Sequence, residues 1–195
     1  MFVTFEGLDG SGKSTQAELL AARLDADGIR VVATREPGGT KLGEQIRDLV
    51  LHGDHVTPWA EALLYAASRA HHVEEVIRPA LDGGAWVVCD RYVDSSVAYQ
   101  GVARELGLER VLELNLTAVG GLMPDRTFLL QLDPAGVPAR VGGERDRLER
   151  EDDGFHARAD EGYRELAKRF PERIVTLDAT RPPDELAEEV YGALH

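Results

Sequence analysis

Residues 7–14 read Gly7-Leu8-Asp9-Gly10-Ser11-Gly12-Lys13-Ser14, and they lie between a short apolar segment and a stretch with helical spacing. The glycines permit backbone conformations that other residues avoid, so several amide groups can point at one anion. A helix that begins near Lys13 adds its N-terminal dipole, and the lysine adds a charge for the β- and γ-phosphates. The final serine supplies a hydroxyl ligand for Mg²⁺. The run and its strand-to-helix context therefore predict a loop that binds the phosphates of a nucleoside triphosphate.

Apolar segments of strand length alternate with helical patterns along the rest of the chain. We expect strands at 2–5, 29–33, 85–89, 126–132 and 173–177, and helices at 13–27, 41–51, 57–81, 94–100, 105–116, 153–170 and 183–194. The long helix contains Pro79, which is expected to bend its last turn. This alternation predicts right-handed crossovers and a five-stranded parallel sheet flanked by helices on both faces. A chain of 195 residues suits one domain, which we expect to span 1–195.

Several polar side chains follow predicted strands. They are Arg35, Asp90, Arg91 and Asp133, and the glycine-rich loop also follows a strand. Ligands of such sheets bind beyond the carboxyl ends of the strands, so we expect these residues to line one cleft. In that cleft the Arg91 guanidinium could hold a phosphate in two parallel hydrogen bonds, or it could form a salt bridge with its neighbour.

The composition excludes several classes of protein. The formal net charge of −13 argues against a general nucleic-acid surface, which needs a basic face. An enzyme of anionic substrates would have to concentrate its positive charge in a cleft. The sequence has no apolar run long enough to span a bilayer, and its single cysteine, Cys89, rules out an internal disulfide framework. We therefore expect a cytoplasmic protein with no membrane or nucleic-acid partner.

Three further runs add to the glycine-rich loop. They are Thr34-Arg35-Glu36-Pro37-Gly38-Gly39-Thr40, Asp90-Arg91-Tyr92-Val93-Asp94-Ser95-Ser96-Val97-Ala98-Tyr99-Gln100-Gly101 and Asp146-Arg147-Leu148-Glu149. Together with residues 5–15, these runs resemble bacterial thymidylate kinase, a nucleoside monophosphate kinase family with the P-loop NTPase fold. The resemblance extends from residue 2 to about residue 180, and the run at 90–101 is its most specific part. It implies transfer of the γ-phosphoryl group of MgATP to dTMP, giving ADP and dTDP, by a protein that pairs as a homodimer.

The resemblance also assigns roles to individual residues. It implies that ATP is bound by Gly7, Leu8, Asp9, Gly10, Ser11, Gly12, Lys13, Ser14 and Thr15, and that Mg²⁺ is bound by Ser14 and Asp90. For dTMP it implies contacts from Asp9, Glu36, Arg47, Tyr65, Arg69, Arg91, Ser96, Tyr99, Gln100 and Glu149. Within that set, Tyr65 stacks on thymine, Arg69 bonds a base carbonyl and Tyr99 crowds the 2′ position of the sugar. Apart from the resemblance, Arg69 interrupts the apolar stripe of its helix, so it either finds a buried partner or extends to the surface.

A basic segment at about 138–152 is expected to form a small lid. The resemblance implies a catalytic set made of Lys13, Arg91, Arg140, Arg145 and Arg147. Some thymidylate kinases carry a catalytic arginine within the phosphate loop. Positions 9–11 of this chain hold no basic residue, so that arginine should come from the lid.

Two alternatives remain open from the sequence. Another small-molecule kinase, for deoxynucleosides or other monophosphates, would share the glycine-rich loop but has no reason to carry the run at 90–101. A GTPase switch would need a guanine-reading Asn-Lys-x-Asp run after a late strand, and the sequence has none.

Overall fold

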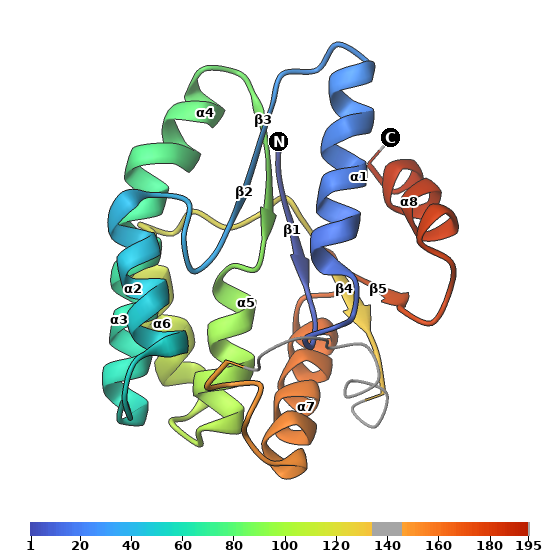
Figure 1. Ribbon diagram of the computed structural model, residues 1–195. Coiled ribbons are helices and arrows are strands. Elements are labelled where there is room, and N and C mark those ends of the chain that lie inside the picture. The colour runs from blue at the N-terminus through green and yellow to red at the C-terminus, as the bar shows by residue number, and fades with distance from the viewer. Residues whose placement is uncertain (134–145, 195) are drawn as a thin grey trace.

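The computed structural model describes residues 1–133 and 146–194. Its strands are β1 (Phe2–Glu6), β2 (Val31–Arg35), β3 (Trp86–Asp90), β4 (Arg126–Gln131) and β5 (Ile174–Asp178). They form one parallel sheet in the order β2-β3-β1-β4-β5 (Figure 1). The predicted five-stranded parallel sheet is confirmed, and each strand lies within about two residues of its expected bounds.

Helices cover the sheet. They are α1 (Lys13–Ala26), α2 (Lys41–His52), α3 (Pro58–His72), α4 (Arg78–Asp82), α5 (Val93–Ser96), α6 (Leu108–Ala118), α7 (Asp153–Arg169) and α8 (Pro183–Gly192), with π-helical segments η1 (Val73–Ile77) and η2 (Val97–Ala103). Figure 1 shows the strands between two groups of helices, with α1 and α8 on one side and α2, α3, α4 and α6 on the other. Among the residues that the structure describes, no helix is both long and apolar enough to cross a membrane.

The single helix expected at 57–81 is interrupted. It divides into α3, the π-helical turn η1 and α4, which contains Pro79 in its first turn. A proline has no amide hydrogen for the carbonyl group four residues earlier, and a wider turn ahead of it accommodates that loss. Similarly, η2 extends the helix expected at 94–100 as far as Ala103. The next helix, α6, starts only after Gly107, whose φ of 96° is not helical.

The central strand β1 fixes the position of the loop that follows it. All five residues of β1 are buried, because strands lie on both sides of it and helices cover both faces. Phe5 stacks on Phe128 of β4 with ring centroids 5.5 Å apart, and Phe2 meets Tyr92 edge-on at 5.0 Å. These contacts pack β1 against β4 and against the turn that follows β3.

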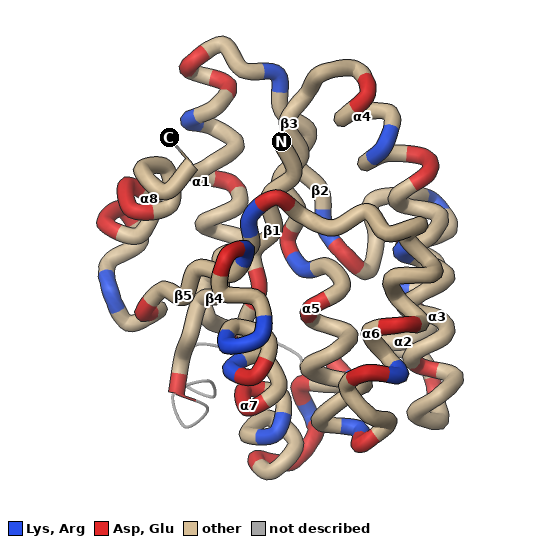
Figure 2. The backbone as a smooth tube through the Cα atoms, turned by 180° about the vertical axis from the view of Figure 1, so that it is seen from behind, with Lys and Arg blue, Asp and Glu red and all other residues tan. Residues whose placement is uncertain are grey.

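Most acidic residues of the described chain lie on the outside of the molecule, although a few, such as Glu36 and Glu61, are buried. Figure 2 shows acidic residues along the helices, including α8, where Asp184, Glu185 and Glu188 are exposed. The excess negative charge is therefore carried by solvated helix faces, and it leaves room for a basic interior cleft.

Candidate active site

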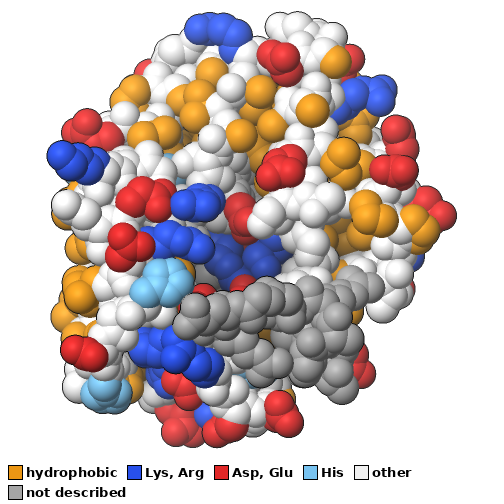
Figure 3. Space-filling model, viewed as in Figure 1, with side chains coloured by type: hydrophobic (Ala, Val, Ile, Leu, Met, Phe, Trp, Pro, Cys, Tyr) orange, Lys and Arg blue, Asp and Glu red, His pale blue; other side chains and the backbone are white. Residues whose placement is uncertain are grey.

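A cleft of about 520 Å³ opens at the carboxyl ends of β1, β2 and β3. Figure 3 shows Lys and Arg side chains gathered in the hollow of this face. Most residues predicted from the sequence line the cleft: Asp9, Gly10, Gly12, Lys13, Ser14, Thr15, Arg35, Glu36, Arg47, Tyr65, Arg69, Asp90, Arg91, Ser96, Tyr99, Gln100 and Glu149. Asp133 does not belong to this lining, which corrects the expectation for that residue. It follows β4, and β4 lies on the far side of β1 from β2 and β3.

The glycine-rich loop connects β1 to α1 as predicted. At Gly7, with φ 138°, a Cβ atom would lie 2.4 Å from the Leu130 carbonyl oxygen, so only glycine fits. Gly12, with φ 97°, directly precedes the first turn of α1. Gly7, Leu8 and Ser11 are buried behind the cleft lining, so any phosphate contact from them would come from the backbone.

The Lys13 side chain is buried at the base of the cleft. Its Nζ donates a hydrogen bond to the Leu8 carbonyl oxygen at 2.7 Å. Burial and the neighbouring Arg91 guanidinium lower the pKa of Lys13 to about 8. An anion at this point would stabilise the charged amine, because it would offset the repulsion between the two cations.

Ser14 and Asp90 form a candidate site for a hard cation. The Ser14 hydroxyl donates to Asp90 Oδ2 at 2.5 Å. Among the described residues, the buried Oδ1 of Asp90 has no hydrogen-bond partner. An ion with a preference for oxygen ligands would satisfy that atom, so this pair fits Mg²⁺.

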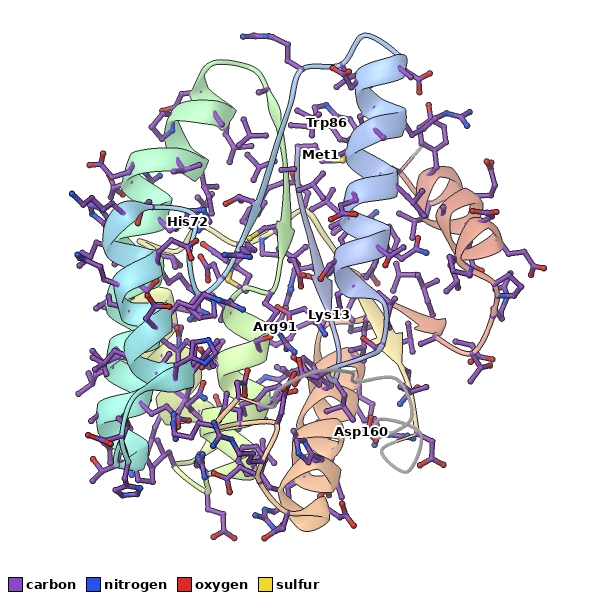
Figure 4. The ribbon with its side chains drawn as sticks, in the orientation of Figure 1. Met1, Lys13, His72, Trp86, Arg91 and Asp160 are labelled. Atoms are coloured by element: carbon purple, nitrogen blue, oxygen red, sulfur yellow. The ribbon has the colours of Figure 1, made fainter. Side chains whose placement is uncertain are left out.

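Arg91 projects from the turn after β3 toward the glycine-rich loop. Figure 4 shows Lys13 and Arg91 close together at this end of the sheet. Arg91 has a left-handed φ of 69°, and its Nη2 donates to Asp9 Oδ1 at 2.5 Å. Its ion pair is therefore made with the loop carboxylate and not with the adjacent Asp90. Burial would raise the pKa of Asp9, but Arg91 and Lys13 outweigh it and hold the pKa at about 2.

Tyr99 also contacts the Asp9 carboxylate. Its hydroxyl donates to Asp9 Oδ2 at 3.3 Å, and the Arg91 guanidinium lies 5.3 Å from the centre of its ring. The three residues come from β1–α1, β3–α5 and η2, and they form one wall of the cleft.

Arg69 is held at a second wall, with only 2% of its side chain exposed. Its Nε donates to Glu36 Oε2 at 2.6 Å, and Nη2 donates to the Tyr92 carbonyl oxygen at 3.0 Å. Its Nη1 donates to Ser96 Oγ at 3.0 Å and also to Asn115 Oδ1. These contacts show that Arg69 has buried partners and does not extend to the surface. They occupy four of its five N–H groups.

Two other predicted dTMP residues also have protein partners. Gln100 donates to Oε1 of the fully buried Glu61 at 2.8 Å, and Arg47 donates to the Pro37 carbonyl oxygen at 3.0 Å. Arg35, which was expected to line the cleft and does so, pairs with Glu44 at 3.0 Å on the surface side of the cleft.

The structure describes only part of the predicted lid. Arg140 and Arg145 lie outside the described residues. Arg147, the third lid arginine, lies outside the cleft lining in the described structure, where its Nη2 donates to Glu61 Oε2 at 2.5 Å and its Nε to the Val50 carbonyl oxygen at 2.8 Å. The physical reason is that a buried carboxylate such as Glu61 needs a cationic partner. The catalytic role of Arg147 stays a prediction. The neighbouring Glu149 does line the cleft.

The sequence reasoning missed Glu6, Glu61, Asn115 and Tyr163. All four are buried polar side chains that bond predicted site residues or their partners. Only Glu6 carried a usable signal, since it is an acid directly after the apolar residues of β1.

The fold and the cleft define a P-loop kinase for a small acceptor, because a triphosphate-binding loop faces a second basic pocket across one cavity.

The comparisons agree with this class. The family model for thymidylate kinase matches residues 5–190. A thymidylate kinase of Clavibacter michiganensis is 53% identical over 97% of this chain and 92% of its own length. One from Deinococcus radiodurans is 49% identical over 100% of this chain and 96% of its own length. The crystal structure of thymidylate kinase from Ehrlichia chaffeensis superposes with a TM-score of 0.84 at 33% identity, covering 100% of this chain and 97% of that one. The chain belongs to the thymidylate kinase family.

Proposed function

We propose that this protein transfers the γ-phosphoryl group of ATP to dTMP, giving ADP and dTDP. One observation carries the proposal: Lys13 of the phosphate loop, the buried Arg69 and the partly buried Arg91 line the same 520 Å³ cleft. A donor and an acceptor bound there would be held next to each other in one cavity. The alternative of another small-molecule kinase has no comparable support.

Phosphoryl transfer to a monophosphate mainly requires that the two substrates are positioned and that positive charge surrounds the phosphates. The attacking oxygen of a nucleoside monophosphate already carries negative charge, so no strong base is required. Lys13 would stabilise charge on the β- and γ-phosphates, and Arg91 would align the acceptor phosphate.

The other end of the cleft would hold the nucleoside. Tyr65, whose ring lines the cavity, would stack on thymine, and Arg69 would direct its remaining N–H group to a base carbonyl. Tyr99 and Asp9, which already contact each other, would limit the space beside the sugar. Ser96, Gln100, Glu36, Arg47 and Glu149 would complete the acceptor pocket.

We also propose that Ser14 and Asp90 hold Mg²⁺, directly or through water. The unpartnered Asp90 Oδ1 supports this assignment. When bound, the ion would neutralise negative charge on the donor phosphates.

Three further features of the proposal concern the whole protein. The segment 138–152 would act as the lid of a single domain, and its described part borders the cleft at Asp146 and Glu149. The exposed Leu63 of α3 and Leu116 of α6 are consistent with pairing of two copies. The single, buried Cys89 is consistent with a cytoplasmic location.

Substitution of Arg91 tests the assignment of the acceptor phosphate. We expect Arg91→Ala to lower kcat/KM for dTMP by about a hundredfold or more, because a charge-stabilising group is lost. Steady-state ADP release with a coupled assay measures the effect, and Lys13→Met should cost at least as much. The matched control is Arg78→Ala, which removes an arginine outside the cleft lining that pairs with Glu74. Near-normal turnover by folded Arg91→Ala protein would contradict the assignment.

A further inference from the structure

Glu6, the last residue of β1, is a fully buried carboxylate directly behind the acceptor pocket. Its Oε1 accepts a hydrogen bond from the Tyr92 backbone N–H at 2.7 Å. Its Oε2 accepts from the Ser95 hydroxyl at 2.6 Å and from the Tyr163 hydroxyl at 3.2 Å. Glu6 therefore ties together the turn after β3, helix α5 and helix α7.

The same two hydroxyl groups hold the Arg91 guanidinium. Nη1 of Arg91 donates to Ser95 Oγ at 3.0 Å and to Tyr163 Oη at 3.2 Å, and these two oxygens are 2.8 Å apart. Each hydroxyl has one proton to donate. If both protons point toward Glu6 or along the Ser95–Tyr163 contact, lone pairs of both oxygens remain available to Arg91.

The carboxylate also stabilises the backbone of that turn. Arg91 has a left-handed φ of 69°, which is unfavourable for a residue with a side chain. The hydrogen bond from the next amide, at Tyr92, to Glu6 holds the peptide in this orientation.

We propose that Glu6 is a positioning residue for the acceptor phosphate: its ionised carboxylate orients the Ser95 and Tyr163 hydroxyls so that both accept from Arg91. Glu6 itself touches no substrate. The proposal rests on the proposed function, in which Arg91 binds the phosphate of dTMP. A protonated Glu6 would instead donate to one of these oxygens and compete with Arg91 for its lone pairs.

Ionisable groups interact with Glu6 from several of the elements around it. They are Asp94 on α5, Arg91 after β3, Cys89 on β3, Lys13 on α1, Tyr163 on α7 and Arg173 before β5. Asp94 is itself paired with Arg173 at 2.6 Å. Burial, together with the Asp94 carboxylate, raises the pKa of Glu6 from its ordinary value of 4.5 to about 7.

The direction of the pH effect follows from this raised pKa. Glu6 is largely protonated below about pH 6 and becomes ionised as the pH rises through 7. Because the pKa of Glu6 is higher in the folded protein than in the unfolded chain, ionisation of Glu6 lowers the free energy of unfolding as the pH rises from about 4.5 to about 7. A neutral isostere should therefore fold at least as well at high pH. Orientation of Arg91, by contrast, should improve as the pH rises.

The experiment compares wild-type protein with Glu6→Gln, which keeps the size of the side chain and removes its ionisation. At about pH 6 the two proteins should have similar kcat/KM for dTMP. At about pH 8.5 the wild type should exceed the variant by about tenfold, the effect of weakening one charge-assisted hydrogen bond, through a higher KM for dTMP in the variant. Ionisation of the substrate phosphate affects both proteins equally, so it cancels in the ratio of their kcat/KM values.

Two controls isolate the effect. The KM for ATP should stay within about twofold, which separates Arg91 from Lys13, the other nearby cation with a shifted pKa. Glu75→Gln makes the same chemical change at an exposed position on η1 and should match the wild type at both pH values. Tyr163→Phe removes one bridging hydroxyl and should raise the KM for dTMP by a smaller factor.

Each outcome is decisive. A ratio of wild type to Glu6→Gln that is the same at all pH values, or an equal rise in both KM values, overturns the role of Glu6. If Glu6→Gln does not fold, an unchanged KM for dTMP in Tyr163→Phe overturns it instead. Wild-type protein that phosphorylates another acceptor but not dTMP refutes the proposed function, and the inference about Glu6 then fails with it.

Discussion

The buried guanidinium of Arg69 shows how single side chains define the acceptor pocket. Its acceptors come from four places in the chain: Glu36 after β2, Tyr92 after β3, Ser96 on α5 and Asn115 on α6. Glu36 in turn contacts His72 Nδ1 at 2.8 Å. Such a network leaves the arginine little freedom, which is what recognition of a base edge requires.

Asn115 is the side-chain partner of Arg69 that lies outside the cleft lining, so its substitution tests the network without touching the acceptor. We expect Asn115→Ala to raise the KM for dTMP about fivefold to tenfold, because Arg69 loses one of two acceptors at Nη1. The KM for ATP should not change. Thr117→Ala is the matched control, since it truncates a polar side chain on α6 that bonds only the Glu113 carbonyl oxygen in the described structure. Unchanged dTMP kinetics in Asn115→Ala would show that Arg69 needs no support from α6.

At this scale the sequence was informative about Arg69 but not about its partners. A charge within an apolar helical stripe predicted that Arg69 needs a partner if it is buried. Asn115 lies 46 residues further along the chain, and an asparagine on an amphipathic helix carries no sign of such a contact. The contact between Arg147 and Glu61 was not predicted for a similar reason, because Glu61 was not recognised as a buried carboxylate.

The elements of the fold were easier to predict than their interruptions. Strands β1 and β3 are short runs of mostly apolar, buried residues, which give a clear signal. The π-helical segments η1 and η2 have no distinct spacing of apolar residues, so they appeared as ordinary helix. One of them, η2, packs closely against α7, where a Cβ atom at Gly162 would lie 2.9 Å from the Ala98 Cα atom.

That contact predicts the effect of Gly162→Ala. Alanine favours a helix over glycine by about 1 kcal/mol, but the clash with η2 should cost about 1–3 kcal/mol or more and dominate. We expect a lower free energy of unfolding in urea and a higher KM for dTMP, because α7 also carries Tyr163. Gly192→Ala at the end of α8 is the matched control, since, apart from its own helix backbone and its chain neighbours, no atom of the described residues lies within 4 Å of its added Cβ. A Gly162→Ala protein as stable as the wild type would show that α7 and η2 can separate without cost.

At the scale of the whole molecule, an acidic surface surrounds a basic cleft. The sequence predicted this arrangement, because a net charge of −13 is compatible with anionic ligands only if the cations are concentrated. It also predicted which strand ends meet, since the ends of parallel strands lie at one edge. It could not predict that β4 would lie beyond β1, which removes Asp133 from the cleft.

The central claim is that the cleft joins an ATP-binding loop to a pocket for thymidine monophosphate, and a panel of acceptors tests it most directly. ADP release should be measured with ATP and, in turn, dTMP, dUMP, dCMP, AMP and thymidine. The account predicts the highest kcat/KM for dTMP, at least about tenfold above dCMP and AMP, because Arg69 and Tyr65 read the base. Thymidine should be almost inert, because Arg91 then has no phosphate to hold. A preference for thymidine or AMP over dTMP would contradict the account.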